Sequence, residues 1–143
     1  MENGINQQQL VQMINHEETI FNNLLKEAEK INSIIIDLEQ TKKAIIEIEK
    51  NPKKMMISLG TGVTIEVEVK NDKCLRLMGE NLFVSDTTEG TKKWIEEKKE
   101  KLEDQLKNLE KNVYATQEKI KNLNGIMDQF EMKKRELINL TKK

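Results

Sequence analysis

The feature that most constrains this chain is a long heptad repeat of apolar residues in each half of the sequence. In the first half, over residues 5–50, apolar residues recur at alternating spacings of three and four. This spacing places them along one stripe of an α-helix, as in a coiled coil. A helix of this length needs a partner to be stable in water. The stripe comprises Leu10, Ile14, Phe21, Leu24, Ala28, Ile31, Ile35, Leu38 and Ile45, with interruptions at Glu17 and Lys42.

The second half carries a matching repeat and predicts a helix over residues 87–141, with Asp86 or Thr87 as its cap. If the chain folds back on itself, the two stripes stay in phase, with Ile45 opposite Ile95 and Leu10 opposite Phe130. Matched length and phase favour this antiparallel hairpin over a long parallel dimer. The second stripe comprises Ile95, Leu102, Leu106, Leu109, Val113, Ile120, Leu123, Met127, Phe130 and Leu137, with Lys99, Thr116, Lys134 and Thr141 at its remaining positions.

The same register places Gly125 opposite Asn15, where both helices contain poor helix-forming residues. Glycine costs about 1 kcal/mol relative to alanine inside a helix, and asparagine costs roughly half as much. The sequence therefore predicts a flexible joint near these two residues. The alternative is that Glu17 reaches solvent and the helices run on undisturbed.

Between the helices, over residues 55–85, the apolar period changes to two, which is typical of half-buried strands. Asn51-Pro52 ends the first helix, and Gly60-Thr61-Gly62 and Asn71-Asp72-Lys73 are turn sequences. Four strands are predicted, at Met56–Leu59, Val63–Val69, Cys74–Met78 and Leu82–Val84. They form two short hairpins with open edges, which favours pairing with another subunit. The predicted oligomerisation residues are Ile57, Leu59, Val63, Ile65, Val67, Val69, Leu75, Leu77, Leu82 and Val84.

Several classes of function are disfavoured by the composition. The single histidine, His16, excludes a His-based triad and a multi-histidine metal site, and the single cysteine, Cys74, excludes an internal disulfide. We therefore expect no catalytic residues, no metal and no cofactor. A net charge of −1 and 3% aromatic residues argue against nucleic-acid binding. Without a long apolar run or a signal-peptide pattern, we expect no membrane contact and a cytoplasmic location.

The pattern of residues 57–86 resembles that of α-class prefoldin subunits. An apolar strand, a Gly60-x-Gly62 turn, a second strand and a second hairpin lead into the final helix. The second hairpin departs from the family pattern, with few glycines and β-branched residues over Cys74–Asn81, which leaves the choice of partner open. The chain is also similar to the archaeal gamma prefoldins, which form filaments instead of hexamers. Its abundance of Lys, Glu, Ile and Asn suits an archaeal source.

This resemblance implies an ATP-independent holding chaperone that assembles with itself or with other prefoldin subunits. It also implies that the tips of the coiled coil bind unfolded proteins and pass them to a chaperonin. A filament-forming structural protein without clients, and an adaptor that recruits one partner, are the alternatives. Apolar residues near the helix ends form the predicted client-binding site: Leu10, Val11, Met13, Ile14, Ile126, Met127, Phe130, Met132, Leu137, Ile138 and Leu140.

Overall fold

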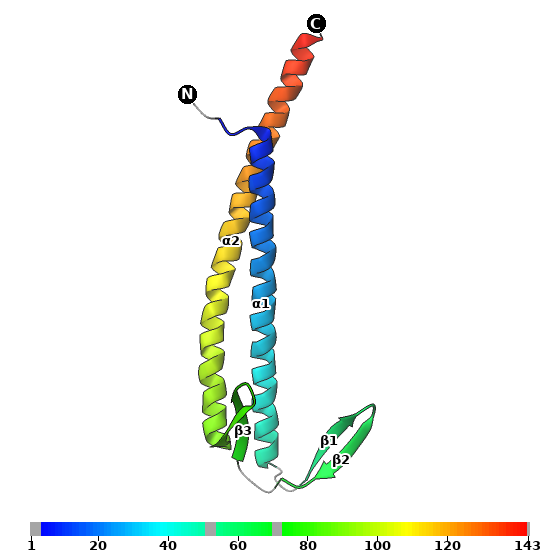
Figure 1. The fold of residues 1–143 in the computed structure, drawn as a ribbon, viewed down its shortest axis with the longest axis vertical. Helices are drawn as coiled ribbons and strands as arrows, with labels where there is room; N and C mark the ends of the chain where they lie inside the picture. Colours follow the sequence, from blue (N-terminus) through cyan, green and yellow to red (C-terminus); the bar gives the residue numbers. More distant parts are fainter. Residues whose placement is uncertain (1–3, 51–53, 70–72, 143) are drawn as a thin grey trace. The chain divides into compact units, whose positions relative to one another are not determined.

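The computed structural model describes residues 4–50, 54–69 and 73–142. Within them, two long helices flank two antiparallel β-hairpins, which confirms the predicted fold class (Figure 1). Residues 51–53 and 70–72, which include the predicted helix end at Pro52 and the turn at Asp72, lie outside the described part. In chain order the elements are α1 (Gln7–Lys50), β1 (Met55–Gly60), β2 (Val63–Val67), β3 (Lys73–Gly79), β4 (Leu82–Thr87) and α2 (Thr88–Thr141).

Internal contacts divide the chain into two units, and each helix contributes to both. The terminal unit comprises the described residues of Met1–Ile31 and Gln105–Lys143. The hairpin unit comprises those of Asn32–Asp104.

The core of the hairpin unit forms where α1 and α2 lie side by side. Leu38, Ile45 and Ile95 are buried together, and Leu102 packs against them. The cluster thus joins the residues that the expected register pairs, Ile45 with Ile95 and Leu38 with Leu102. Burying a large aliphatic side chain contributes roughly 1.5–3 kcal/mol, so this small core is a major source of stability.

Both β-hairpins are short and antiparallel. In the first, Ile57 pairs with Ile65 and Met55 with Val67, so β2 ends two residues before the predicted Val69. Thr61 and Gly62 have positive φ angles of 44° and 77°, which explains why glycine is suited to this turn. The second hairpin pairs β3 with β4, Leu77 lying opposite Phe83.

The cap of α2 is Thr87, one of the two predicted candidates. Its Oγ1 accepts a hydrogen bond of 3.0 Å from the backbone N–H of Gly90. Asp86 has a different role: its Oδ2 lies 2.9 Å from Nη2 of Arg76 in β3, and its Oδ1 accepts from the N–H of Thr87. Asp86 is therefore a link between the second hairpin and α2.

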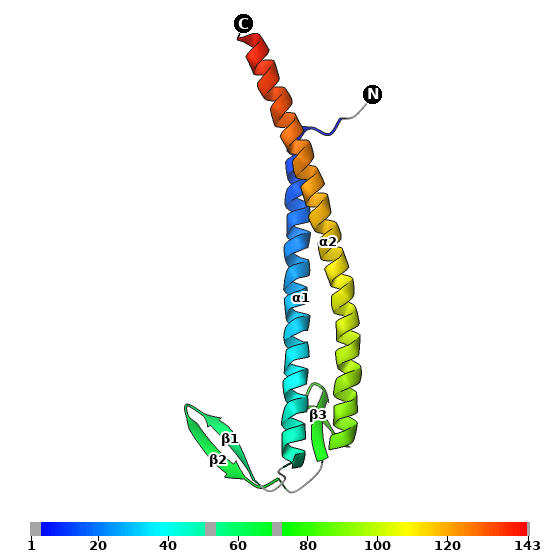
Figure 2. The same ribbon diagram turned by 180° about the vertical axis from the view of Figure 1, so that it is seen from behind.

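In the terminal unit the apolar stripe of α1 faces inward: Leu10, Ile14 and Ile31 are buried, and the stripe residues between them are half-buried. The stripe of α2 is half-buried or buried only as far as Met127, and Phe130 and Leu137 are exposed. Figures 1 and 2 show the reason, because α2 continues past the first turn of α1. The predicted pairing of Leu10 with Phe130 is therefore wrong.

The register in this unit departs from the expected one toward the start of α1. Phe21 and Ile120 line one groove, close to where the expected antiparallel register places them. Farther on, however, Gln7 contacts Met127, where the expected register places Lys133. Straight helices drift by about 20° per heptad relative to a strict seven-residue repeat. The apolar stripes of two helices with the same seven-residue repeat therefore stop facing each other unless the helices supercoil fully.

The same departure moves Gly125 away from the level of Asn15. With Gln7 against Met127, Gly125 lies nearer the level of Leu10 than that of Asn15. Both helices run unbroken through their weak helix formers, and the flexible joint stays a prediction. Glu17 faces α2, with its carboxylate 3.7 Å from Nζ of Lys119.

Candidate functional site

The N-terminus of α1 is capped by two reciprocal hydrogen bonds between Asn6 and Gln9. The Oδ1 atom of Asn6 accepts from the N–H of Gln9 at 2.8 Å, and Oε1 of Gln9 accepts from the N–H of Asn6 at 3.0 Å. This is a capping box built from two neutral amides. It satisfies two backbone donors without placing a charge at the helix end.

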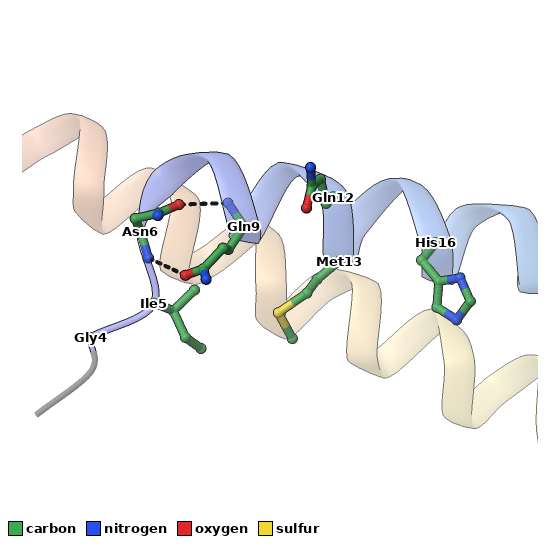
Figure 3. Close-up of a pocket in the computed structure, with 7 residues that line it drawn as sticks. All are labelled: Gly4, Ile5, Asn6, Gln9, Gln12, Met13 and His16. Carbon is green, nitrogen blue, oxygen red and sulfur yellow. Dashed lines mark hydrogen bonds between the residues drawn. The ribbon is translucent and has the colours of Figure 1, made fainter.

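A groove of about 780 Å³ runs along this capped end of α1. None of the side chains that line it is an acid, a lysine or an arginine. Figure 3 shows Ile5 and Met13 pointing to the same side of α1 as His16, beside the Asn6–Gln9 cap. We call this surface the amide groove, which is lined by Gly4, Ile5, Asn6, Gln9, Gln12, Met13 and His16.

The end of α2 presents a second surface in the same unit. Beyond Met127, no residue in the described part of this helix is buried, and Leu137 and Leu140 are 64% and 71% exposed. Large apolar side chains left in water without a partner mark interaction surfaces. We call this surface the helix-end patch, which comprises Ile126, Phe130, Met132, Leu137, Ile138 and Leu140.

The structure divides the predicted client-binding residues into two groups. Leu10 and Ile14 are buried in the stripe between the helices, and Met127 is half-buried. Val11, Met13 and the six residues of the helix-end patch are exposed. The sequence analysis did not predict the amide groove, because it relied on the periodicity of apolar residues and most of the side chains that line this groove are polar. The available signal was the concentration of uncharged amides, which make up five of the seven residues over 6–12.

The first β-hairpin carries an exposed apolar face. Because successive strand residues alternate between faces, Ile57 and Ile65 lie on the same face as Val63 and Val67. Ile57, Val63 and Ile65 are exposed, as is Leu59 beside the turn, whereas Val67 is half-buried. Val69 lies beyond the end of β2 and is half-buried.

The second hairpin is held against α2 by Arg76. Its guanidinium carbon lies 4.9 Å from the ring centre of Trp94, and its Nη2 binds Asp86. Cys74, on the same face of β3, packs against the core of the hairpin unit. Val84, a predicted oligomerisation residue, lies opposite Arg76 in the register and so on the same face, but its side chain remains exposed.

The opposite face of the second hairpin is exposed and apolar. Leu75 and Leu77, two of the predicted oligomerisation residues, lie on it at 71% and 59% exposure. Phe83, opposite Leu77, is 59% exposed and belongs to the same face, although the sequence analysis did not select it. Leu82, near the turn, is also exposed.

Ion pairs link α1 to α2 along the hairpin unit. Lys42, one of the two interruptions in the first stripe, lies 2.6 Å from Glu96, and Lys99 lies 2.8 Å from Glu39. The hydrogen bond from Lys99 lowers the pKa of the Glu39 carboxyl below its usual value and raises the pKa of Lys99. Lys42 and Lys99, two charged residues of the stripes, thus have partners on the opposite helix.

A third pair strengthens the same connection. Lys92 lies 2.8 Å from Glu49, and their hydrogen bond lowers the pKa of Glu49 and raises that of Lys92. Lys42 likewise lowers the pKa of Glu96. Each shift favours the charged forms, so these pairs stabilise the antiparallel arrangement around neutral pH.

Across residues 4–50, 54–69 and 73–142, no group of three His, Cys, Asp or Glu side chains is placed to hold a metal ion. In those ranges, neither helix has an apolar stretch long enough to cross a bilayer.

Comparison with known proteins gives one family and one fold. The family model described as "Prefoldin subunit" matches residues 18–133. A cryo-EM structure of filamentous PFD from Methanocaldococcus jannaschii is similar with a TM-score of 0.67 and 21% sequence identity. The alignment covers 78% of this chain and 95% of that one. None of the curated proteins matches the chain in sequence.

Proposed function

This chain belongs to the prefoldin family, and we propose that it is an ATP-independent holding chaperone that binds non-native proteins through the helix-end patch. Prefoldins are non-enzymatic, chaperone-like or filament-forming proteins, so the chain is not an enzyme. In this proposal the chain also passes its clients to a chaperonin and works in the cytoplasm.

The observation that supports client binding is the exposed apolar end of α2. A helix with one apolar stripe normally buries that stripe against a neighbour. Here Phe130 and Leu137 keep the spacing of the stripe, and they are exposed together with Leu140. Figure 1 shows that α2 continues past the start of α1. Non-native proteins expose apolar side chains of their own, and covering both surfaces removes apolar area from water.

The proposal is tested by suppression of aggregation of several unrelated unfolded proteins without ATP. Replacing Phe130, Leu137 and Leu140 by serine should strongly reduce suppression, because it removes most of the apolar area of the patch. The matched control replaces Leu25, Ile34 and Ile36 by serine. These are exposed apolar residues of α1 outside the patch. Undiminished suppression by the patch variant, or equal loss in the control, would contradict the proposal.

A structural role is the second candidate, and the similarity to a filamentous PFD favours it. In this alternative the β-hairpins join subunits into filaments without client binding. The same assay separates the two candidates, because a purely structural filament should not keep unfolded proteins soluble.

A further inference from the structure

We propose that the free ends of α2 from two copies of this chain pair with each other in antiparallel orientation, through a second apolar stripe near the C-terminus of the helix. This pairing goes beyond the proposed function, because it needs no client. It also differs from assembly through the β-hairpins, because the contact is made by helices alone.

The apolar stripe of α2 changes flank after Leu123. The stripe that packs against α1 includes Leu123 and Met127, which are half-buried. Later positions on the Met127 flank are polar, namely Lys134 and Thr141. Ile126 lies on the other flank of Leu123, because residues three and four positions along a helix fall on opposite sides of the starting residue. Its side chain is 41% exposed.

A regular stripe follows this other flank to the end of the helix. Its positions alternate in spacing between three and four residues, as in a coiled coil, and five of the six are apolar. The stripe is about 26 Å long, and Figures 1 and 2 show α2 continuing past the first turn of α1. We call it the second seam, which comprises Leu123, Ile126, Phe130, Lys133, Leu137 and Leu140.

The second seam lacks a partner within the chain. Ile126 and Phe130 are 41% and 37% exposed, and Leu137 and Leu140 are 64% and 71% exposed. A helix of a coiled coil buries such a seam against another helix of matching repeat. In the terminal unit α1 already packs against the other stripe of α2, through Leu10, Ile14 and Ile31. The matching helix must therefore come from another molecule.

A second copy fits because the second seam is self-complementary when reversed. If Ile126 of one copy lies opposite Leu137 of the other, two-fold symmetry generates the same contact again with the copies exchanged. The same register fills every position of the seam on both copies. The remaining opposed pairs are Leu123 with Leu140 and Phe130 with Lys133.

Charge selects the antiparallel orientation. A parallel pair would place Lys133 directly opposite Lys133 of the second copy, and facing like charges are unfavourable. The antiparallel register places Lys133 against Phe130 instead, whose ring face attracts a cation. At the positions that flank the seam, Glu136 and Lys134 face uncharged residues of the other copy. No like charges therefore meet along this interface.

Pairing at the helix ends has a consequence for larger assemblies. A single contact of this length is weak, but several helix ends carried by one assembly bind together with a gain from multivalency. The paired ends would link separate assemblies through their arms. They would also cover Phe130, Leu137 and Leu140 of the helix-end patch.

The test is disulfide cross-linking of full-length chains in which Cys74→Ser removes the native thiol. One protein carries Ile126→Cys and a second carries Leu137→Cys, both at exposed positions. The proposed pair brings these two positions within the roughly 4.4–6.8 Å between Cα atoms that a disulfide requires, whereas identical positions lie about 16 Å apart along the helix. With a mild oxidant, the equimolar mixture should form covalent dimers at least about tenfold faster than either protein alone.

The matched control replaces the first protein of the mixture by Tyr114→Cys in the same background. Tyr114 is 66% exposed on α2 but lies outside the second seam. This mixture should cross-link no faster than its components. Equal rates in the two mixtures would overturn the pairing. Rapid cross-linking of either seam protein by itself would show parallel helices and overturn the antiparallel arrangement.

Discussion

At the scale of single residues, Gly90 connects the cap of α2 to the second hairpin. A Cβ atom at this position would collide with the carboxylate of Asp86. That carboxylate is held by Arg76, whose side chain is only 16% exposed. We expect Gly90→Ala to displace Asp86 and destabilise the protein by about 1–2 kcal/mol, although alanine is the better helix former. Thermal or urea unfolding followed by circular dichroism measures this loss.

Gly125 provides the matched control, because a Cβ atom there would meet nothing within 4 Å. Gly125→Ala should therefore stabilise the chain by up to about 1 kcal/mol through helix propensity alone. Stabilisation by both substitutions would show that Asp86 moves aside without cost. The sequence identified Asp86 and Thr87 as rival caps but could not reveal this conflict, because it depends on the hairpin that brings Arg76 to Asp86.

At the scale of the helices, ion pairs make the stability of the hairpin unit depend on pH. The pKa values of Glu39, Glu49 and Glu96 lie below the usual 4.5. Their contribution to stability is therefore complete above pH 4.5 and is lost as pH falls through the lowered values. The pKa values of Lys92 and Lys99 lie above 10.5, so the contribution is also lost as pH rises through these raised values.

The variant that isolates this effect replaces Glu39, Glu49 and Glu96 by glutamine. Its melting temperature should differ most from that of the unmodified chain between about pH 5 and pH 10. The difference should shrink at both extremes and in high salt, since these pairs are partly exposed. A difference that stays constant from pH 3 to pH 11, taken as approximate limits, would show that the pairs do not set the stability.

The heptad repeats predicted both helices and the buried stripe of α1, because periodicity directly determines which face is apolar. They could not predict where the pairing of the two helices stops, since Phe130 and Leu137 continue the repeat of α2 past the level at which α1 begins. The amide groove could not be predicted from the sequence either, because the hydrogen bonds between Asn6 and Gln9 depend on the residue at which α1 begins. Lys42 and Lys99 looked like defects in the stripes, and only the opposite helix shows their partners.

At the scale of the whole molecule, we predict that subunits join through the exposed faces of the β-hairpins. Ile65→Pro removes a backbone donor from β2 and should reduce the size of the assembly. A matched substitution at an exposed position of the other β2 face, Thr64→Ser, should leave it unchanged. Size-exclusion chromatography with light scattering gives the masses. An unaltered mass for Ile65→Pro would place the joint elsewhere.

The chain contains a single tryptophan, and its position has a spectroscopic consequence. Trp94 lies in the hairpin unit, with Arg76 and Lys98 each within 5 Å of its ring centre. Its emission is therefore sensitive to the local field of two cations and to any movement of the second hairpin. Events at the helix-end patch involve no tryptophan of this chain. Intrinsic fluorescence can thus follow subunit association without a label, while a dye on the client reports capture in the same cuvette.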